Sequence, residues 1–168
     1  IGSSGDLSHS KKIMDTSIGQ GGDLQKYFSD DVHCTFLFGL DKSPVNEACH
    51  RYVEKQVYNR RIRKSKPPLS IFIQFDTSKN IIEKEGLLEE DEYQRNIINS
   101  IYGNGTIDKK NSYIHKELNE KGTSKFTIIS CQFSLHYYFE TKLTLMGYIR
   151  NITENCKKNG YFIGCCYN

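Results

Sequence analysis

The stretch from Ile13 to Leu24 constrains the fold of this chain more than any other. Its apolar residues end at Asp15, glycines occupy positions 19, 21 and 22, and a helix is expected to begin near Gly22. Glycine lets the backbone bend tightly and approach a ligand where any Cβ atom would collide. The helix that follows directs free N–H groups and its positive dipole end toward the turn. The stretch therefore predicts a strand, a glycine-rich turn and a helix that together hold a nucleotide or nucleoside cofactor.

The spacing of the glycines separates one kind of cofactor from another. A dinucleotide-binding fingerprint has the pattern G-x-G-x-x-G, and its third glycine would fall on Leu24. A hydride-transfer enzyme is therefore disfavoured. The pattern D-x-x-x-G-x-G-G-D-L resembles instead motif I of the S-adenosylmethionine-dependent methyltransferases. Taken alone, the motif leaves open a glycine-rich turn that binds no ligand.

Length and composition narrow the class of protein further. A chain of 168 residues is long enough for one domain with a sizeable core, and its formal net charge of +3 permits an anionic partner without requiring one. We expect no membrane association, because the sequence has no apolar run of membrane-spanning length and no signal-peptide pattern. The cysteines form no C-x-x-C pair and mostly lie in apolar runs, which predicts reduced, buried thiols in a cytosolic protein and disfavours zinc. They are Cys34, Cys49, Cys131, Cys156, Cys165 and Cys166.

Apolar, strand-like runs alternate with helical patterns along the chain. After a polar linker at 1–10, strands are predicted at 11–16, 34–40, 69–75, 126–133 and 161–166. Helices are predicted at 22–29, from 43 into the 60–66 region, and at 89–102, 112–121 and 143–158. This alternation predicts an α/β fold with a mostly parallel sheet and right-handed crossovers.

Two helix ends carry specific signals. Ser43 and Pro44 are typical of an N-cap and the first helical position. Lys157 and Lys158, followed by Asn159-Gly160, are typical of a helix C-terminus. The cationic stretch Arg60 to Lys66 is either a contact for RNA phosphates or a solvated helix end.

Four predicted strand ends carry polar groups: Asp15, Asp41, Asp76 and Gln132. In a parallel sheet, ligands bind beyond the carboxyl ends of the strands, near the point where the strand order reverses. Asp41 lies roughly 20 residues past the glycine turn, where a carboxylate can accept both ribose hydroxyls. Asp76 ends the next strand and is placed to accept from an adenine amino group. Each aspartate can also be an ordinary helix N-cap or loop residue, but three carboxylates at one edge favour a binding site.

Residues 130–140, with the sequence SCQFSLHYYFE, carry the most specific motif. This run resembles the signature C-Q-F-x-x-H-Y-x-F-E of the messenger RNA cap (guanine-N-7) methyltransferases. The resemblance extends to the runs 19–24, 149–151 and 159–164, and residues 22–28 resemble the corresponding run of poxvirus capping enzymes. It covers residues 11–168 apart from the segment between Asp76 and Phe126. It implies a Rossmann-like, class I methyltransferase domain from a capping enzyme of a large DNA virus, of the mimivirus or poxvirus kind.

The resemblance implies a role for each matching residue. S-adenosylmethionine would be held by the turn backbone from 17 to 22 and by the groups around it, namely Asp15, Ser17, Gly19, Gln20, Gly21, Asp23, Asp41, Asp76 and Gln132. The guanine of the cap would face Phe133, His136 and Tyr137. Without the motif, Phe133 and Tyr137 would be assigned to an aromatic core, and His136 to a satisfied core or edge histidine.

The sequence departs from the family pattern in several places. Ser17 and Ile18 replace the usual Gly and Cys of the turn. Gln20 replaces a lysine that contacts the cofactor carboxylate, and an amide keeps a hydrogen bond there without its charge-assisted part. Residues 81–122 form a longer insertion than expected, which we interpret as a virus-specific interface. The family's further strands, which bear a cap-binding glutamate and tyrosine, do not follow the fifth predicted strand, so we expect residues 11–168 to be part of a methyltransferase domain.

The resemblance implies methyl transfer from S-adenosylmethionine to guanine N-7 of the mRNA cap, with no metal and no general base. The expected partners are the capped RNA 5′ end and other capping-enzyme domains or a regulatory subunit. The expected location is the cytoplasm (viral factory or virion) for a viral protein and the nucleus for a cellular one. Two alternatives stay open: a methyltransferase of the same fold that acts on a small molecule or protein, and a non-catalytic scaffold that binds the cofactor or a partner subunit.

Overall fold

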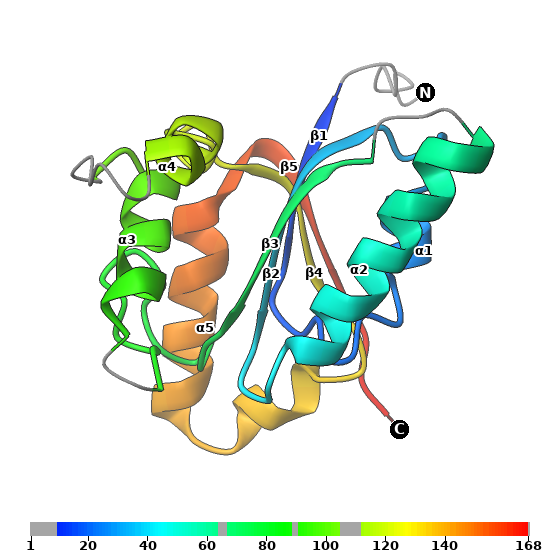
Figure 1. The fold of residues 1–168 in the computed structure, drawn as a ribbon. Helices are drawn as coiled ribbons and strands as arrows, with labels where there is room; N and C mark the ends of the chain where they lie inside the picture. Colours follow the sequence, from blue (N-terminus) through cyan, green and yellow to red (C-terminus); the bar gives the residue numbers. More distant parts are fainter. Residues whose placement is uncertain (1–9, 64–66, 89–90, 105–111, 168) are drawn as a thin grey trace.

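The computed structural model describes residues 10–63, 67–88, 91–104 and 112–167. These residues form a five-stranded sheet in which every strand pair is parallel (Figure 1). The strand order is β3-β2-β1-β4-β5, so the first strand lies at the centre. The strands are β1 (Lys11–Asp15), β2 (Cys34–Asp41), β3 (Leu69–Gln74), β4 (Phe126–Cys131) and β5 (Cys156–Gly164). The predicted α/β class and parallel sheet are confirmed.

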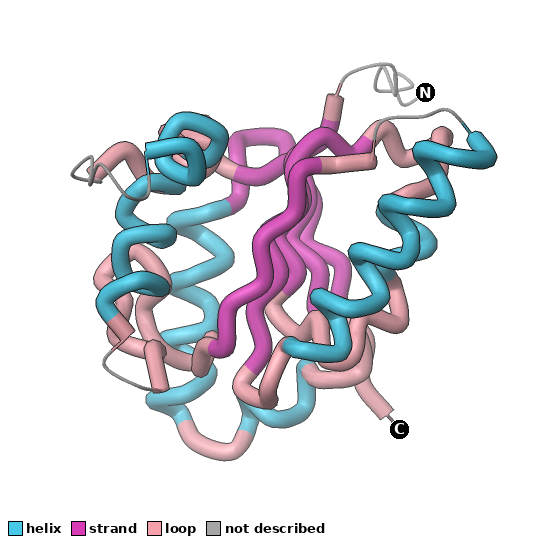
Figure 2. Tube along the Cα trace, viewed as in Figure 1, coloured by secondary structure: helices cyan, strands magenta, loops and turns pink. Residues whose placement is uncertain are grey.

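Helices cover both faces of the sheet, which gives three layers (Figures 1 and 2). One face carries α1 (Leu24–Tyr27), α2 (Asn46–Tyr58) and the π-helical turn η1 (Asn59–Arg63) that continues α2. The other face carries α3 (Glu92–Ile101), α4 (Ser112–Leu118) and α5 (Lys142–Asn155). A short 3-10 helix, η3 (Leu135–Phe139), follows β4. Across the described ranges, no helix combines the length and apolar character needed to cross a membrane.

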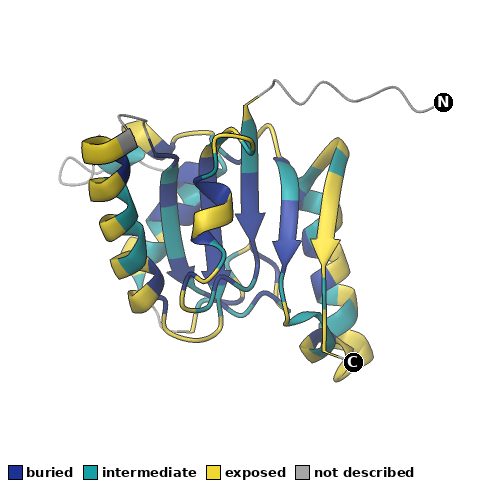
Figure 3. Ribbon diagram, turned by 90° about the vertical axis from the view of Figure 1, so that its right-hand side faces the viewer, coloured by how far each residue is buried: buried dark blue, intermediate teal, exposed yellow. Residues whose placement is uncertain are grey.

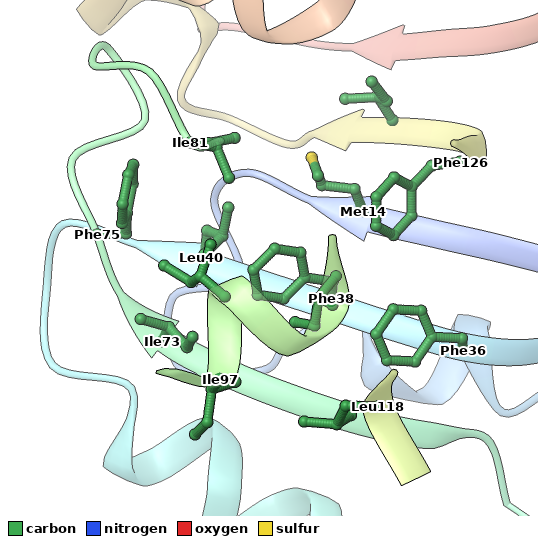
Figure 4. Packing of buried hydrophobic residues seen from close by; sticks show 13 residues of the cluster. Met14, Phe36, Phe38, Leu40, Ile73, Phe75, Ile81, Ile97, Leu118 and Phe126 are labelled. Atoms are coloured by element: carbon green, nitrogen blue, oxygen red, sulfur yellow. The ribbon is translucent and has the colours of Figure 1, made fainter. Parts of the chain in front are cut away.

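Side chains of β2 show how the sheet separates two cores. Phe36, Phe38 and Leu40 belong to a large core in which they pack with the apolar faces of α3 and α4 (Figure 4). Leu37 lies between them in sequence and belongs to the second core, on the α1 and α2 side. Successive side chains of a strand point to opposite faces, so a strand buried on both sides must be apolar at nearly every position. This is why the run 34–40 was predictable as a strand covered on both faces.

The second core fixes the position of the glycine turn. Leu24 and Tyr27 of α1 and Ala48 of α2 pack against Ile13 and Leu37 from the strands. The helix after the turn is shorter than the predicted 22–29. Gly21, with a φ of +78°, belongs to the turn, and Asp23 is the N-cap of the helix.

α5 is held closely against the loop that follows β3. A Cβ atom at Gly147 would collide with the backbone oxygen of Ser78, so only glycine allows this approach. One turn further along, the Asn151 amide donates to the carbonyl oxygens of Thr77 (2.8 Å) and Lys79 (2.7 Å). Its oxygen accepts the backbone N–H of Ile81. The Arg-Asn motif at 150–151 therefore fixes the loop that begins at Asp76.

Two predicted helix ends are wrong. α2 begins at Asn46 rather than at Ser43-Pro44, because the Ser43 N–H donates to the Asp41 carboxylate (2.7 Å) and so belongs to the turn that leaves β2. α5 ends at Asn155, and the residues predicted as its cap lie inside β5. Asn159 has a φ of 64°, and the β4–β5 register shifts beside it. A residue with positive φ suits an irregularity in a strand as well as a helix cap, so the Asn-Gly signal was ambiguous.

The prediction of buried cysteines is only partly confirmed. All six are free thiols, and Cys131 is buried, whereas Cys34, Cys156 and Cys165 are half-buried. Cys49 and Cys166 are exposed, which contradicts the prediction for these two. Cys49 lies on the outer side of α2, and Cys166 follows the end of β5.

The segment 81–122 contributes to the main core. Ile97, Ile98 and Ile101 of α3 and Leu118 of α4 are all buried there. The predicted helices at 89–102 and 112–121 are thus confirmed in type, with shorter bounds. Their interpretation as an insertion that forms a virus-specific interface stays a prediction.

Candidate functional site

The predicted strand ends meet at one edge of the sheet. Because all strands are parallel, Asp15 and Asp41, the last residues of β1 and β2, lie at the same edge as Asp76 and Gln132, which follow β3 and β4. The chain leaves β1 toward β2 on one side, and β4 lies on the other side of β1. The strand order reverses here, and open α/β sheets bind ligands at such a point.

The glycine turn is held against the end of β2 by its backbone. Gly19 has a φ of +51°, and its N–H donates to Oδ2 of Asp41 at 2.8 Å. A Cβ atom at Gly21 would lie 2.7 Å from the Leu24 side chain and 3.1 Å from the Ala48 backbone. At Gly22, by contrast, a Cβ atom would meet nothing within 4 Å. The conformation and packing of the turn therefore favour glycine at positions 19 and 21, whereas the backbone at Gly22 borders open space.

Asp41 uses both carboxylate oxygens to organise the strand end. Oδ2 accepts from Gly19, and Oδ1 accepts the backbone N–H of Ser43 at 2.7 Å. A carboxylate offers about four lone-pair positions, so each oxygen keeps capacity for a ligand hydroxyl. Asp41 is therefore both a brace of the turn and an available acceptor.

Asp76 is held ionised at the end of β3. Partial burial acts to raise the pKa of its carboxyl, but hydrogen bonds from the Ser78 hydroxyl (2.7 Å) and N–H (3.0 Å), together with Lys42, outweigh burial and lower the pKa. The Lys42 ammonium lies 3.5 Å from Oδ2. This side chain is thus a charged acceptor at the predicted position for an adenine amino group.

Asp15 is enclosed by the protein. Its side chain is 1% exposed, with Oδ1 accepting the Ser17 N–H at 3.0 Å and Oδ2 accepting the Tyr27 hydroxyl at 2.7 Å. Burial raises the pKa of Asp15 to about 6, although the hydrogen bonds from Tyr27 and Ser17 act to lower it. The geometry gives Asp15 the role of bracing the first residues of the turn from below.

Ser17 joins the turn to the end of β4. Its hydroxyl oxygen accepts the Gln132 N–H at 3.0 Å, which bridges the gap at the reversal of strand order. The Gln132 side-chain oxygen accepts from the Cys165 thiol at 3.2 Å, and the Cys165 sulfur accepts the Phe133 N–H at 3.3 Å. Cys165 was predicted only as a buried thiol, and nothing in its spacing indicated this contact.

Phe133 is held in an unusual conformation. Its φ is 58°, in the left-handed region that bulky residues rarely adopt. Its ring is 52% exposed and lies 5.4 Å from the ring of Tyr167, centroid to centroid. His136 packs on Tyr137 at 4.1 Å and on Tyr167 at 6.0 Å, and its buried Nδ1 has no hydrogen-bond partner among the described residues. Backbone strain of the kind found at Phe133 is concentrated at functional sites. The residues assigned to the cap thus form one aromatic cluster, to which Tyr167 is an unpredicted addition.

Gln20 and Asp23 lie on the outer part of the turn. Gln20 is exposed, and the Asp23 carboxylate is 2.6 Å from the Lys26 ammonium. Asp23 precedes α1 without capping it by a side-chain hydrogen bond. The Asp23 carboxylate, which the sequence assigns to the cofactor, is therefore already engaged in a local ion pair.

The cationic run is not brought to this edge. α2 spans 13 residues, about 20 Å, and runs from the carboxyl end of β2 back to the amino end of β3. Arg60 and Arg61 are exposed at its far end, while Lys64–Lys66 lie outside the described residues. Cys49, Val53 and Val57 line a hollow along the outer side of α2, and none of the strand-end residues lines it. We assign the site to the strand ends because the polar groups converge there.

A group of three or more His, Cys, Asp or Glu suited to a metal ion is not found in the described part of the chain. The aspartates at the strand ends are instead engaged by backbone N–H groups, by hydroxyls and, at Asp76, by Lys42. The predicted absence of a metal cofactor stays a prediction.

A parallel sheet with a glycine turn after its central strand, and carboxylates after the neighbouring strands, defines a Rossmann-like methyltransferase fold. Residues 104–168 match the family described as the mRNA (guanine-N(7))-methyltransferase domain. The chain is also 31% identical over 158 residues to a probable mRNA-capping enzyme of Acanthamoeba polyphaga mimivirus. That alignment covers 90% of this chain and 12% of the relative. Over residues 104–168 the chain is therefore similar to the mRNA (guanine-N(7))-methyltransferase domain family.

Proposed function

We propose that this chain transfers a methyl group from S-adenosylmethionine to guanine N-7 of the mRNA 5′ cap, as part of mRNA capping. The observation that carries the proposal is the position of residues 132–137. The segment follows β4, contacts the glycine turn through Ser17, and presents an exposed aromatic cluster beside it. It lies within the part of the chain that matches the family.

The groups at the strand ends fit S-adenosylmethionine. Asp41 retains lone pairs for ribose hydroxyls, and Asp76 is an ionised acceptor for an adenine amino group. The backbone from 17 to 22 is held beside these carboxylates by the Gly19 N–H, which donates to Asp41. Carboxylates at this edge also suit a cofactor that carries a sulfonium and an ammonium charge. Gln20 and Asp23 are assigned to its amino-acid end, together with Gln132.

S-adenosylmethionine supplies a methyl group that its sulfonium already activates. The N-7 lone pair of guanine is free at neutral pH, so the protein has no proton to remove. A general base would typically add about 10²- to 10⁴-fold, whereas holding two reactants in line can lower the barrier by about 7–11 kcal/mol. We assign catalysis to positioning, with no side chain acting as acid or base.

The aromatic cluster suits the guanine in substrate and product. Phe133 and Tyr137 are 52% and 68% exposed, so their rings are open to a planar base. Methylation leaves the guanine cationic, and an aromatic face attracts a cation by about 0.5–2 kcal/mol. His136 packs between Tyr137 and Tyr167, and its buried Nδ1 has no hydrogen-bond partner among the described residues.

The test is a methyl-transfer assay with three RNAs of one sequence. They carry an unmethylated guanosine cap, a 5′-triphosphate, or a cap already methylated at N-7. We expect label from S-adenosylmethionine only in the first RNA, and no label with Asp41→Ala. Equal labelling of the triphosphate RNA would contradict cap specificity. Binding of S-adenosylhomocysteine without transfer to any RNA would favour a non-catalytic scaffold, a candidate that the exposed amide of Gln20 supports.

The surroundings of the domain are part of the proposal. The chain spans 12% of the length of its mimivirus relative. We propose that capped RNA is the substrate and that other capping-enzyme domains or a regulatory subunit are its partners. A viral factory in the cytoplasm, or the virion, is the location that the viral relative supports.

A further inference from the structure

We infer that Tyr138 is a positioning residue that ties the aromatic cap-facing segment to the glycine turn through a buried hydroxyl relay, next to a second relay that joins α5 to the same turn; the inference rests on the proposed function. Tyr138 lies in the 3-10 helix η3, directly after His136 and Tyr137. Unlike these two, it is buried, with 7% of its surface exposed. It belongs to neither the cofactor-binding nor the cap-binding set described above.

The first relay runs from Tyr138 to the backbone of the turn. The Tyr138 hydroxyl lies 2.6 Å from the Thr77 hydroxyl, which donates to the carbonyl oxygen of Thr16 at 3.2 Å. The Tyr138 hydroxyl itself lies 3.4 Å from the same oxygen. Each hydroxyl has one proton, so the consistent order is Tyr138 to Thr77 to Thr16. Thr16 directly precedes Ser17, and the relay therefore ends on the first residues of the turn.

The second relay reaches Thr16 from α5. The Tyr148 hydroxyl lies 2.8 Å from the Thr16 hydroxyl, which donates to the carbonyl oxygen of Ser130 at 2.9 Å. The Thr16 proton is used on Ser130, so Tyr148 is the donor to Thr16. Burial raises the pKa of both Tyr138 and Tyr148, which keeps the two hydroxyls protonated and able to donate. Thr16, Thr77 and Tyr148 are each no more than 4% exposed.

The two tyrosines also stack on one another. Their ring centroids are 3.6 Å apart with an interplanar angle of 7°. Tyr138, Tyr148 and Cys131 form a small core under η3 that is separate from the two large ones. The stack sets the distance between η3 and α5. The hydroxyls of Tyr138 and Thr77 set the position of η3 relative to the turn. Removing one hydroxyl therefore leaves the stack in place and releases only the second constraint.

This arrangement makes a distinct prediction for Tyr138→Phe. The turn keeps its contacts from Asp15, Asp41 and Ser17, so cofactor binding does not depend on Tyr138. The cap-facing segment loses its buried tie to Thr16 and Thr77. We expect the KM for capped RNA to rise roughly tenfold, the effect of one buried hydrogen bond, while the dissociation constant of S-adenosylhomocysteine stays within about twofold.

The experiment measures both quantities, with kcat and the unfolding midpoint, for the full chain. Thr77→Val is expected to raise the RNA KM as Tyr138→Phe does, Thr77→Ser to restore it, and the double variant to add little. The matched control is Tyr102→Phe, which removes a hydroxyl that donates to Asn155, away from the strand ends. It is expected to change stability without changing the RNA KM.

Three results would overturn the inference. One is an unchanged RNA KM in a folded Tyr138→Phe variant. Another is an equal rise with Tyr102→Phe, which would show a general effect of stability. The third is a loss of S-adenosylhomocysteine binding that matches the loss of RNA binding. Failure of the proposed function is distinguishable, because the unmodified chain would then fail to methylate capped RNA.

Discussion

The carboxylate of Asp41 accepts the backbone N–H of Gly19 at 2.8 Å, so the end of β2 directly braces the glycine turn. Its other oxygen accepts the Ser43 N–H that leads toward α2. One side chain thereby links two loops that border the proposed cofactor site.

Asp41→Asn removes the negative charge at nearly constant size. A hydrogen bond to a charged group contributes about 1.5–3 kcal/mol, which corresponds to roughly 10- to 100-fold in affinity. We expect the affinity for S-adenosylhomocysteine, measured by calorimetric titration, to fall by that factor. Glu47→Gln is the matched control, because Glu47 is an exposed carboxylate paired with Arg51 on α2. An affinity within twofold of the unmodified chain would contradict the role of Asp41.

The buried carboxyl of Asp15 should make the stability of the fold decrease as pH rises. Its pKa is raised from 3.8 to about 6, chiefly by burial, so the folded state binds its proton more tightly than the unfolded state. The stabilisation is therefore full below the unfolded pKa and is lost as pH rises through about 6. The difference corresponds to about 3 kcal/mol, taking 1.36 kcal/mol per pKa unit. Asp15→Asn should accordingly lack this loss between pH 4 and pH 7.

The measurement is urea unfolding of both chains at several pH values. As pH rises from 4 to 7, we expect the free energy of unfolding of the unmodified chain to fall relative to that of Asp15→Asn. Asp30→Asn, at an exposed position before β2, serves as control and should show no such trend. A constant difference between Asp15→Asn and the unmodified chain across this range would refute the prediction.

Gly21→Ala and Gly22→Ala separate two roles of neighbouring glycines. At Gly21 the new Cβ atom combines a φ of +78° with a contact 2.7 Å from Leu24, whereas at Gly22 it meets nothing within 4 Å. We expect Gly21→Ala to lower the free energy of unfolding by about 1–3 kcal/mol. Gly22→Ala should change it by less than about 0.5 kcal/mol. Denaturant unfolding measures both, and equal losses would show that the turn is not constrained as described.

Reversing the charge of the cationic run tests its proposed contact with RNA phosphates. Replacing Arg60, Arg61 and Arg63 by Glu should flatten the dependence of RNA binding on salt, by about 0.7 in slope for each single-strand phosphate that the protein no longer neutralises. Arg60 and Arg61 follow α2, whose 13 residues carry the chain about 20 Å away from the carboxyl ends of the strands. Methylation of a capped dinucleotide should therefore be unchanged. An unchanged slope with long RNA would identify the run as a solvated helix end.

The strands were predictable where burial on both faces imposes an apolar residue at nearly every position. β2 and β4 begin at the predicted residues for this reason. Helix ends were less predictable, because Ser43 and Asn159-Gly160 satisfy local geometry that occurs equally in turns and strand irregularities. For Ser43 the deciding contact comes from Asp41, and for Asn159-Gly160 it comes from the pairing of β5 with β4.

The strand-end carboxylates were also predictable, because parallel strands bring their carboxyl ends together. The hydroxyl relays were not. Thr16 is separated from Thr77 by 61 residues and from Tyr148 by 132. Nothing near any of these residues indicates its partner, and Tyr148 looks like one apolar position of α5. Side chains that meet only through tertiary packing leave no periodic pattern.

β5 forms an outer edge of the sheet in the described structure, and its side chains are the most exposed of any strand (Figure 3). Tyr161, Phe162 and Ile163 are 63%, 39% and 50% exposed. An open strand edge with apolar side chains is a template for pairing with another chain. A concentrated preparation of this chain alone should therefore self-associate along β5. Replacing Ile163 by lysine should reduce this self-association without changing catalysis.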